Sequence, residues 1–358
     1  MLIRSLALTD FRCHARMQLE LSTASAPGGV AIIGDNATGK TSVLEAVYLL
    51  SRGVSFRGSS PSDVIRHDQD HALVVATVEV QNEASRYAVQ RGRAGLEIRI
   101  GGRRDATVLE LARALPIQVM DPRAHRLIDE GPVHRRRMLD WGVFHVEHSF
   151  LHDWRQFQRV LRQRNAACRR GDRKQLRAWN PAFIESAQCV DAARRQHLEA
   201  LACSWRERVN HLLDDELNPV LGYRPGWPKH AALGEALEDA ESRELDAGYT
   251  VVGPHRADIR LQLGGRQVRH QASRGQQKAL VMALLTAQVE LVAEQLGHSP
   301  LLLIDDFSAE WGAAMRHRAV AQLQEGSAQW ISTWLDAPGS DLELAEMFHV
   351  EHLARAAP

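Results

Sequence analysis

The stretch Gly34-Asp35-Asn36-Ala37-Thr38-Gly39-Lys40-Thr41 follows the pattern G-x-x-x-x-G-K-[ST] throughout. It comes after an apolar run at residues 29–33 and before residues 42–50, whose apolar spacing predicts a helix. A strand, a glycine-rich loop and a helix in this order form a P-loop. This stretch therefore predicts an α/β fold built around a phosphate-binding turn.

The residue types of this loop suit a bound nucleotide. Glycines let backbone N–H groups surround a phosphate, and the following helix adds the partial positive charge of its N-terminus. We expect Lys40 to reach the β- and γ-phosphates and the Thr41 hydroxyl to bind Mg²⁺. The alternative is an ordinary glycine-rich turn. The predicted nucleotide-binding residues are Gly34, Asp35, Asn36, Ala37, Thr38, Gly39, Lys40, Thr41 and Ser42.

A P-loop needs a carboxylate to help hold Mg²⁺, and a candidate lies late in the chain. Residues 301–304 are Leu-Leu-Leu-Ile, typical of a buried strand, and Asp305 and Asp306 follow directly. We predict that Asp305 binds the metal and that Asp306 orients or deprotonates the attacking water. Asp306 and Lys40 are thus the predicted catalytic residues. Two solvated carboxylates at a strand end are the alternative.

A second candidate for phosphate binding lies between these two elements. Ser273 and Gly275 precede an apolar helix predicted for residues 276–296, and Ser-x-Gly at a helix start can bind an anion. Because the P-loop already holds the phosphates, this motif is useful if it completes the site of a partner subunit. Serine is also a common helix cap, so the motif alone leaves both interpretations open.

The rest of the chain has three parts. The first 120 residues contain short β-type runs, at 2–8, 17–21, 29–33, 73–80, 87–90 and 96–100. From Pro122 onward, apolar residues three and four positions apart predict long helices, including an antiparallel pair joined within residues 169–181. After an acidic stretch, β-type runs return at 249–253, 259–263, 301–304 and 328–333. The predicted domains are an α/β head made of residues 1–120 and 241–358, and an inserted, mainly helical lobe at 121–240.

The order of these motifs resembles the ABC-type ATPase heads of SMC-like DNA repair proteins. Phe11-Arg12-Cys13-His14 precedes the P-loop, and Ser273-Arg274-Gly275-Gln276-Gln277 is similar to the signature of these heads. Further stretches resemble the RecF family in particular. They are Gly-Val-Ser-Phe-Arg at 53–57, Arg-Arg-Arg-Met-Leu-Asp-Trp at 135–141 and Gly-Pro-His-Arg-Ala-Asp at 253–258. The resemblance covers essentially the whole chain.

The resemblance implies a P-loop ABC-type ATPase head with an inserted helical lobe, and the activity of a weak ATPase with ATP and Mg²⁺ as cofactors. Two subunits would dimerise around two nucleotides, and hydrolysis would release them. Ser273, Gly275 and Gln276 would then face the ATP of the opposing subunit, and Arg12 would lie near the nucleotide. The implied role is in recombinational repair and replication restart, binding single-stranded and double-stranded DNA at gaps or junctions and helping RecO and RecR load RecA.

The chain departs from the family pattern at two motifs. Ala272 stands where the signature usually begins with leucine, and Arg274 replaces a smaller or polar residue. The family's Ser-Glu-Leu-Asp stretch after Asp306 corresponds here to Ser-Ala-Glu-Trp-Gly at 308–312, which lacks the aspartate that signals between subunits. This difference concerns the coupling of two ATP sites more than ATP binding. The chain also lacks the long heptad repeats of SMC arms.

The charge of the chain is balanced overall but not locally. Forty-four Lys and Arg match forty-four Asp and Glu, which excludes a polycationic tail. Residues 121–180 contain thirteen arginines and Lys174 against seven acidic residues. Some of these arginines share a helical face, which favours contact with a DNA backbone, although a solvated face is the alternative. They are Arg155, Arg159, Arg162, Arg169, Arg170 and Arg173.

Other features leave alternatives open. Arg135, Arg136 and Arg137 can contact DNA or can organise the head by pairing with phosphates or acids. A P-loop kinase and an ATP-gated scaffold with little DNA affinity are the competing functions. The scattered cysteines lack C-x-x-C spacing, and the histidines at 145, 148 and 152 lack a fourth ligand, so no metal cluster is expected. Without a signal peptide or a long apolar stretch, we expect a cytoplasmic protein with no membrane partner.

Overall fold

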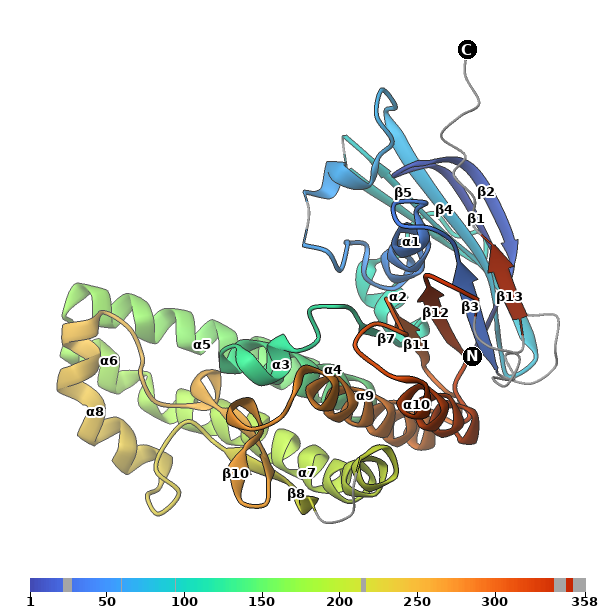
Figure 1. The fold of residues 1–358 in the computed structure, drawn as a ribbon. Helices are drawn as coiled ribbons and strands as arrows, with labels where there is room; N and C mark the ends of the chain where they lie inside the picture. The colour runs from blue at the N-terminus through green and yellow to red at the C-terminus, as the bar shows by residue number, and fades with distance from the viewer. Residues whose placement is uncertain (22–27, 59, 94, 214–216, 338–345, 350–358) are drawn as a thin grey trace. The chain divides into compact units, whose positions relative to one another are not determined.

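The computed structural model describes the chain except for residues 22–27, 59, 94, 214–216, 338–345 and 350–358. Its compact units are unit 1, residues 1–124 and 282–358, and unit 2, residues 125–281. Helix α9 (Arg274–Leu296) begins in unit 2 and ends in unit 1 (Figure 1). The predicted lobe ended at residue 240, whereas the structure groups residues 241–281 with it. The reason is that the β-type run at 259–263 pairs with strands of unit 2.

Unit 1 contains two sheets of different kinds. The first is antiparallel, with the order β2-β1-β4-β5-β6, and in β4 buried residues alternate with half-buried ones. The second is parallel, with the order β13-β3-β12-β11-β7, and β3, β11 and β12 are buried along their whole length. The strands are β1 (Leu2–Phe11), β2 (His14–Glu20), β3 (Gly29–Ile33), β4 (His71–Val80), β5 (Glu83–Gly92), β6 (Gly95–Ile100), β7 (Ile117–Met120), β11 (Leu301–Ile304), β12 (Trp330–Trp334) and β13 (Glu346–His349).

The helices of unit 1 are few, and one of them organises the core. Helix α1 (Lys40–Arg52) contacts strands of both sheets, and Val43, Leu44, Val47 and Leu50 are buried in the shared core. The sheets therefore hold the helix that follows the P-loop on two sides. The other helical elements described here are η1 (Pro61–Val64), α2 (Val108–Ala114), α10 (Ala313–Glu325) and the part of α9 that follows residue 281.

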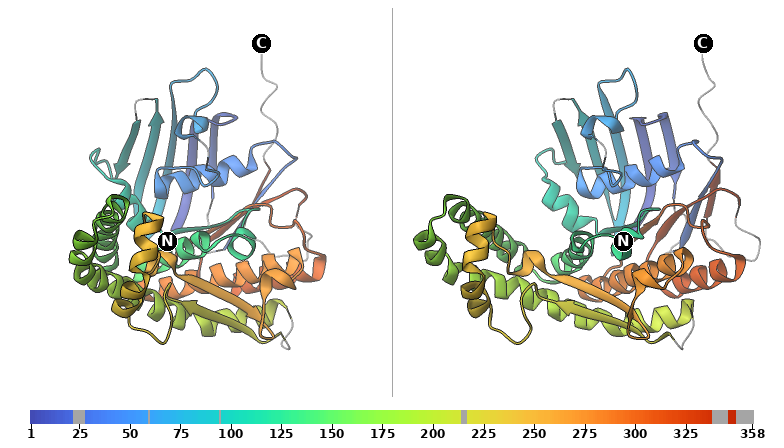
Figure 2. Two further views of the ribbon diagram at one scale, coloured as in Figure 1. Left: turned by 90° about the vertical axis from the view of Figure 1, so that its left-hand side faces the viewer. Right: turned by 60° about the vertical axis from the view of Figure 1, so that its left-hand side comes forward.

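Unit 2 is mainly helical, as predicted, with one small antiparallel sheet of order β10-β9-β8. Arg164 reaches Asn180 while Phe157 contacts Phe183, so α5 and α7 run antiparallel, and the predicted helix pair is confirmed (Figure 2). The elements are α3 (Arg126–Asp129), α4 (Pro132–Val146), α5 (Phe150–Arg170), α6 (Arg173–Ala178), α7 (Asn180–Leu212), β8 (Pro219–Arg224), α8 (Leu233–Ala247), η3 (Pro254–Arg256), β9 (Asp258–Leu263), β10 (Arg266–Gln267) and η4 (Val268–His270).

A buried ion pair explains why the strand predicted at residues 249–253 does not form. Arg164 donates to Glu244 at 3.0 Å and to Thr250 Oγ1 at 3.0 Å, and both charged side chains are almost fully buried. The backbone N–H of Thr250 donates to Asn165, and that of Val251 donates to Glu244. These backbone groups are satisfied by side chains, so the segment is a loop rather than a strand.

His255, from the Gly-Pro-His-Arg-Ala-Asp stretch, lies in the same region. Its ring contacts Phe157 and Phe183, and its Nε2 donates to the Thr250 carbonyl oxygen at 2.8 Å. Burial lowers the pKa of His255 to about 4, and the positive charges of Arg256, Arg136 and Arg164 act in the same direction. The histidine is therefore neutral in the folded protein near pH 7.

We expect unit 2 to lose stability as the pH falls below about 6.5. The unfolded chain then binds a proton at His255, whereas the folded chain binds this proton only when the pH approaches its pKa of about 4. The expected cost is about 2 kcal/mol between pH 7.5 and pH 5. Urea unfolding at both pH values measures it, and His255→Gln should remove most of the difference. Equal losses in the wild type and His255→Gln would contradict the prediction.

Candidate functional site

The P-loop connects β3 to α1 and turns at a residue that has to be glycine. Gly39 caps α1 with a φ of +100°, a conformation that side chains disfavour. A Cβ atom at Gly39 would lie 2.5 Å from Cys13 Sγ and 2.6 Å from His14 Nε2. The hairpin that follows β1 thus packs directly on the loop, and His14 Nε2 donates to the Gly39 carbonyl oxygen at 3.2 Å.

Lys40 lies inside the curve of the loop. Its Nζ donates to the carbonyl oxygens of Gly34 at 2.5 Å and Asp35 at 2.7 Å, and its side chain is buried. Thr38 Oγ1 also donates to the Asp35 carbonyl oxygen, at 2.9 Å. A compact ammonium group enclosed by a P-loop is placed to bind phosphate oxygens.

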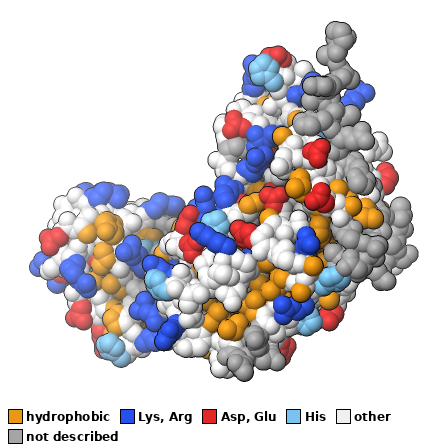
Figure 3. Space-filling model, viewed as in Figure 1, with side chains coloured by type: hydrophobic (Ala, Val, Ile, Leu, Met, Phe, Trp, Pro, Cys, Tyr) orange, Lys and Arg blue, Asp and Glu red, His pale blue; other side chains and the backbone are white. Residues whose placement is uncertain are grey.

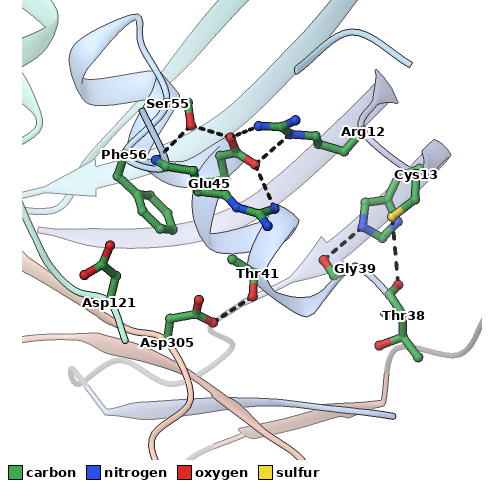
Figure 4. A network of polar contacts seen from close by, with 12 residues as sticks. Arg12, Cys13, Thr38, Gly39, Thr41, Glu45, Ser55, Phe56, Asp121 and Asp305 are labelled. Atoms are coloured by element: carbon green, nitrogen blue, oxygen red, sulfur yellow. Dashed lines mark hydrogen bonds and ion pairs between the residues drawn. The ribbon is translucent and has the colours of Figure 1, made fainter. Parts of the chain in front are cut away.

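The two predicted metal ligands meet although they are far apart in the sequence. Thr41 Oγ1 donates to Asp305 Oδ1 at 2.9 Å (Figure 4). Thr333 Oγ1 donates to the same oxygen at 2.7 Å. Burial raises the pKa of Asp305, and the neighbouring Asp306 and Asp121 add to this effect. A bound cation would favour the ionised carboxylate, and hydroxyl and carboxylate oxygens are the ligands that Mg²⁺ prefers. These residues therefore fit a magnesium ion.

The backbone turns away from the direction of β11 at Asp306. The φ of Asp306 is +53°, and its backbone N–H donates to Thr333 Oγ1 at 2.8 Å. Asp305 remains buried beneath the P-loop, while Asp306 lines the cleft that also contains Lys40 and Thr41. The left-handed turn at the end of β11 thus gives the two adjacent carboxylates different surroundings.

A buried carboxylate in α1 holds the arginines of the site. Glu45 is fully buried and accepts two hydrogen bonds from Arg12, at 2.9 and 2.5 Å. Ser55 also donates to Glu45, and the Arg57 guanidinium lies 3.9 Å from its other oxygen. Figure 4 shows this network beside the Thr41–Asp305 contact. Glu45 therefore holds the two arginines that line the cleft, Arg12 and Arg57.

Asp121, which follows β7, helps to hold the segment that carries Ser55 and Arg57. Asp121 accepts from Arg123 Nε at 2.9 Å, and the Arg123 guanidinium donates to the carbonyl oxygens of Phe56 at 2.9 Å and Arg57 at 3.2 Å. The backbone that carries Arg57 is thus held from two sides, by Glu45 and by Arg123.

These groups surround a cleft of about 510 Å³ in unit 1, large enough for a nucleotide. The predicted residues that line it are Arg12, Asn36, Ala37, Gly39, Lys40, Thr41, Ser42 and Asp306. The lining residues that the sequence analysis did not select are Cys13, Arg57, Asp63 and Ile65. Glu45 had a usable signal, because it lies one helical turn after Thr41 and is the only charged residue within positions 43–50 of α1.

The signature-like residues lie in the first turn of α9, in unit 2. Ser273 Oγ accepts from the Gln276 backbone N–H at 3.3 Å, and the Gln276 side chain accepts from the Ser273 N–H at 2.9 Å, which makes a capping box. Arg274, unusual for the family, pairs with Asp129 at 2.6 Å, and Gln277 donates to the same carboxylate. Gly275 belongs to this turn.

Two of the family-like stretches meet inside unit 2. Arg135 pairs with Asp258 at 2.7 Å, and Arg136 donates to the Ala257 carbonyl oxygen at 2.7 Å. The arginines at 135 and 136 are therefore structural, while Arg137 is exposed. Asp258, the acid that pairs with Arg135, belongs to unit 2. In the sequence analysis, all residues after 240 had instead been assigned to the head.

The arginine face of α5 and α6 is exposed, but not all of it is free. Arg173 and the nearby Arg177 pair with Glu241, at 3.2 and 2.6 Å. Among the residues that the structure describes, Arg155, Arg159 and Arg162 have no acidic partner. The acidic helix α8 thus neutralises one end of the stripe.

Comparison with known proteins places the chain in a family. The model of the RecF/RecN/SMC N-terminal domain matches residues 2–348, so the chain belongs to this family of SMC-like proteins. A DNA replication and repair protein RecF of Thioalkalivibrio sulfidiphilus is 39% identical over 325 residues, covering 89% of this chain and 90% of that protein. RecF of Erwinia tasmaniensis is 37% identical, covering 98% and 97%. The chain is thus a member of the RecF family.

A solved structure of the recombination mediator RecF with ATP superposes with a TM-score of 0.82, at 23% identity, covering 98% of this chain and 95% of that one. This likeness confirms the predicted fold class. Within the described residues one helix, α9, has the length and apolar character to cross a membrane, and 67% of the qualifying stretch is buried inside the protein. Buried core helices pass the same test.

We expect Glu45→Gln to weaken ATP binding about tenfold, because a neutral amide holds two guanidiniums less firmly than a carboxylate does. Titration with a fluorescent ATP analogue measures the affinity. The matched control is Glu79→Gln, which removes the half-buried Arg4–Glu79 pair of unit 1 and should leave the affinity unchanged. Tighter binding by Glu45→Gln would show that net charge outweighs positioning.

Proposed function

We propose that the protein is an ATP-dependent DNA-binding protein of recombinational repair and replication restart that acts as an ATP-clamped dimer. The observation that carries the proposal is the contact between Thr41 and Asp305 beside the enclosed Lys40. A P-loop joined in this way to a strand-end carboxylate is the arrangement that nucleotide hydrolysis requires. The names of the relatives supply the biological setting.

The roles of the residues follow from their positions. The P-loop N–H groups and Lys40 bind the β- and γ-phosphates, and Thr41 with Asp305 holds Mg²⁺, which neutralises charge on these phosphates when bound. Asp306, at the edge of the cleft, orients and deprotonates the attacking water. Arg12 contacts the nucleotide from the turn between β1 and β2. Slow turnover is expected, because a second subunit has to complete the site that contains Asp306.

The second subunit supplies the signature. Ser273 is exposed and Gly275 and Gln276 are half-buried at the N-terminus of α9, where helix N–H groups attract an anion. They bind the γ-phosphate of the opposing ATP, so ATP joins the two subunits and hydrolysis separates them. The relatives solved with ATP support the nucleotide in this proposal.

DNA is the proposed partner of the dimer, at gaps and at junctions of single and double strands. The guanidiniums of Arg155, Arg159 and Arg162, which have no acidic partner among the described residues, form one cationic part of the surface of unit 2. RecO and RecR are the proposed protein partners, and loading of RecA the proposed outcome. An ATP-gated scaffold with little DNA affinity is the competing function. A P-loop kinase has no need for the signature or for the paired aspartates.

Nucleotide-gated dimerisation is tested by sedimentation. Lys40→Met should remain monomeric with ATP, because the phosphates lose their cation, while Asp306→Asn should bind ATP, fail to hydrolyse it and accumulate as a dimer. The wild type with ADP and without nucleotide provides the reference. Identical sedimentation of Asp306→Asn with and without ATP would rule out the clamp.

DNA contact by the α5 face is tested by titrating a gapped duplex at several salt concentrations. Replacing Arg155, Arg159 and Arg162 by Gln should weaken binding and reduce the salt slope by up to about 3, roughly 0.9 for each lost phosphate contact. Arg177→Gln is the control, because Arg177 is already paired with Glu241. A wild type without salt-dependent affinity would favour the scaffold instead.

A further inference from the structure

Unit 2 contains a second cavity, of about 200 Å³, that no motif had indicated. It lies at the small sheet, next to α3 and η4. Its charged and polar lining is unusually rich in arginine, and the group also includes a histidine and one aspartate. The lining side chains of this kind are Arg135, Arg224, Asp258, Arg260, Gln267, Arg269 and His270.

The strand register explains how the arginines come together. Arg224 of β8 lies opposite Asp258 of β9, and Gly222 lies opposite Arg260. Positions two apart in a strand share a face, so Arg224, Asp258 and Arg260 lie on one face of the sheet, and the buried Ile259 and Leu261 also line the cavity. Gly222 has no side chain, which leaves the space in front of Arg260 open.

The charge of this cavity is not balanced within unit 2. The Asp258 carboxylate is already bound by Arg135, at 2.7 and 3.3 Å, and Arg135 also donates to carbonyl oxygens of residues 127 and 130. Across the part of the chain that the structure describes, Arg224, Arg260 and Arg269 have no acidic partner. Three guanidiniums thus share one concavity with no free carboxylate.

A concave group of like charges attracts an anion, because the low-dielectric walls concentrate its field. Guanidinium groups bind phosphate oxygens through paired N–H donors. Figure 3 shows Lys and Arg side chains gathered over the region of β10. By contrast, the α5–α6 stripe is partly neutralised by Glu241. Within the described part of unit 2, the cavity is therefore a cluster of cations whose only carboxylate, Asp258, is already paired with Arg135.

We propose that this cavity is a phosphate-binding site and that Arg224, Arg260 and Arg269 hold a phosphate of the DNA backbone there. The inference deepens the proposed function, on which it rests, by adding a contact outside the arginine-rich segment 121–180. The same chemistry suits a phosphate group of a free nucleotide, and the experiment separates the two sources.

The test compares Arg224→Gln/Arg260→Gln with Arg266→Gln in the full chain. Arg266 is an exposed arginine of β10 that does not line the cavity. The double variant should bind a gapped duplex about tenfold more weakly, and its salt slope should fall by about 1 to 2, while its affinity for ATP stays unchanged. The control variant should bind DNA nearly as the wild type does.

Calorimetric titration with ADP identifies the source of the phosphate. One ADP per chain in the wild type, together with weaker DNA binding by the double variant, assigns the cavity to DNA, whereas a second ADP that the double variant loses assigns it to a free nucleotide. Equal DNA affinity in the double and control variants, with no second ADP site, overturns the inference. If the wild type itself fails to bind DNA, the proposed function fails separately.

Discussion

The hydrogen bond from Thr41 to Asp305 is the contact on which the rest of the structure depends. Its partners are 264 residues apart, and they meet because β3, β12 and β11 are neighbouring parallel strands whose carboxyl ends share an edge. Thr333, at the end of the strand between them, binds the same carboxylate. The two strands belong to one sheet although the segment between them in the sequence includes all of unit 2.

Arginine does two different jobs in unit 2. Several guanidiniums are buried or nearly so, and each meets a carboxylate together with further oxygen acceptors, because the planar fork can satisfy several acceptors at once. An excess of arginine in a stretch of sequence therefore does not by itself indicate which residues form a DNA-binding surface. The exposed guanidiniums without acids are the ones that we propose to bind phosphate. The internal arginines are Arg135, Arg164 and Arg194, bound to Asp258, Glu244 and Asp140.

Local patterns predicted much of the candidate site. The loop from Gly34 to Thr41 and the aspartates after β11 carry their chemistry in consecutive residues, so their types and spacing suffice. Glu45 was missed because it pairs with Arg12, which lies 33 residues away in the sequence. Asp121 was missed because it acts through its neighbour Arg123, which donates to carbonyl oxygens of the distant residues Phe56 and Arg57. The cavity at β8 and β9 likewise exists only through cross-strand register.

The sequence alone determined the P-loop, most strands of unit 1, the paired helices and membership of the fold class, because each is encoded by short-range periodicity or by consecutive residues. Only the tertiary structure decided where residues 241–281 belong. A β-type run specifies a strand but not its partner, and the run at 259–263 pairs with β8 and β10. The tertiary structure also decided which charged side chains are buried, since pairing and burial depend on neighbours brought together by folding.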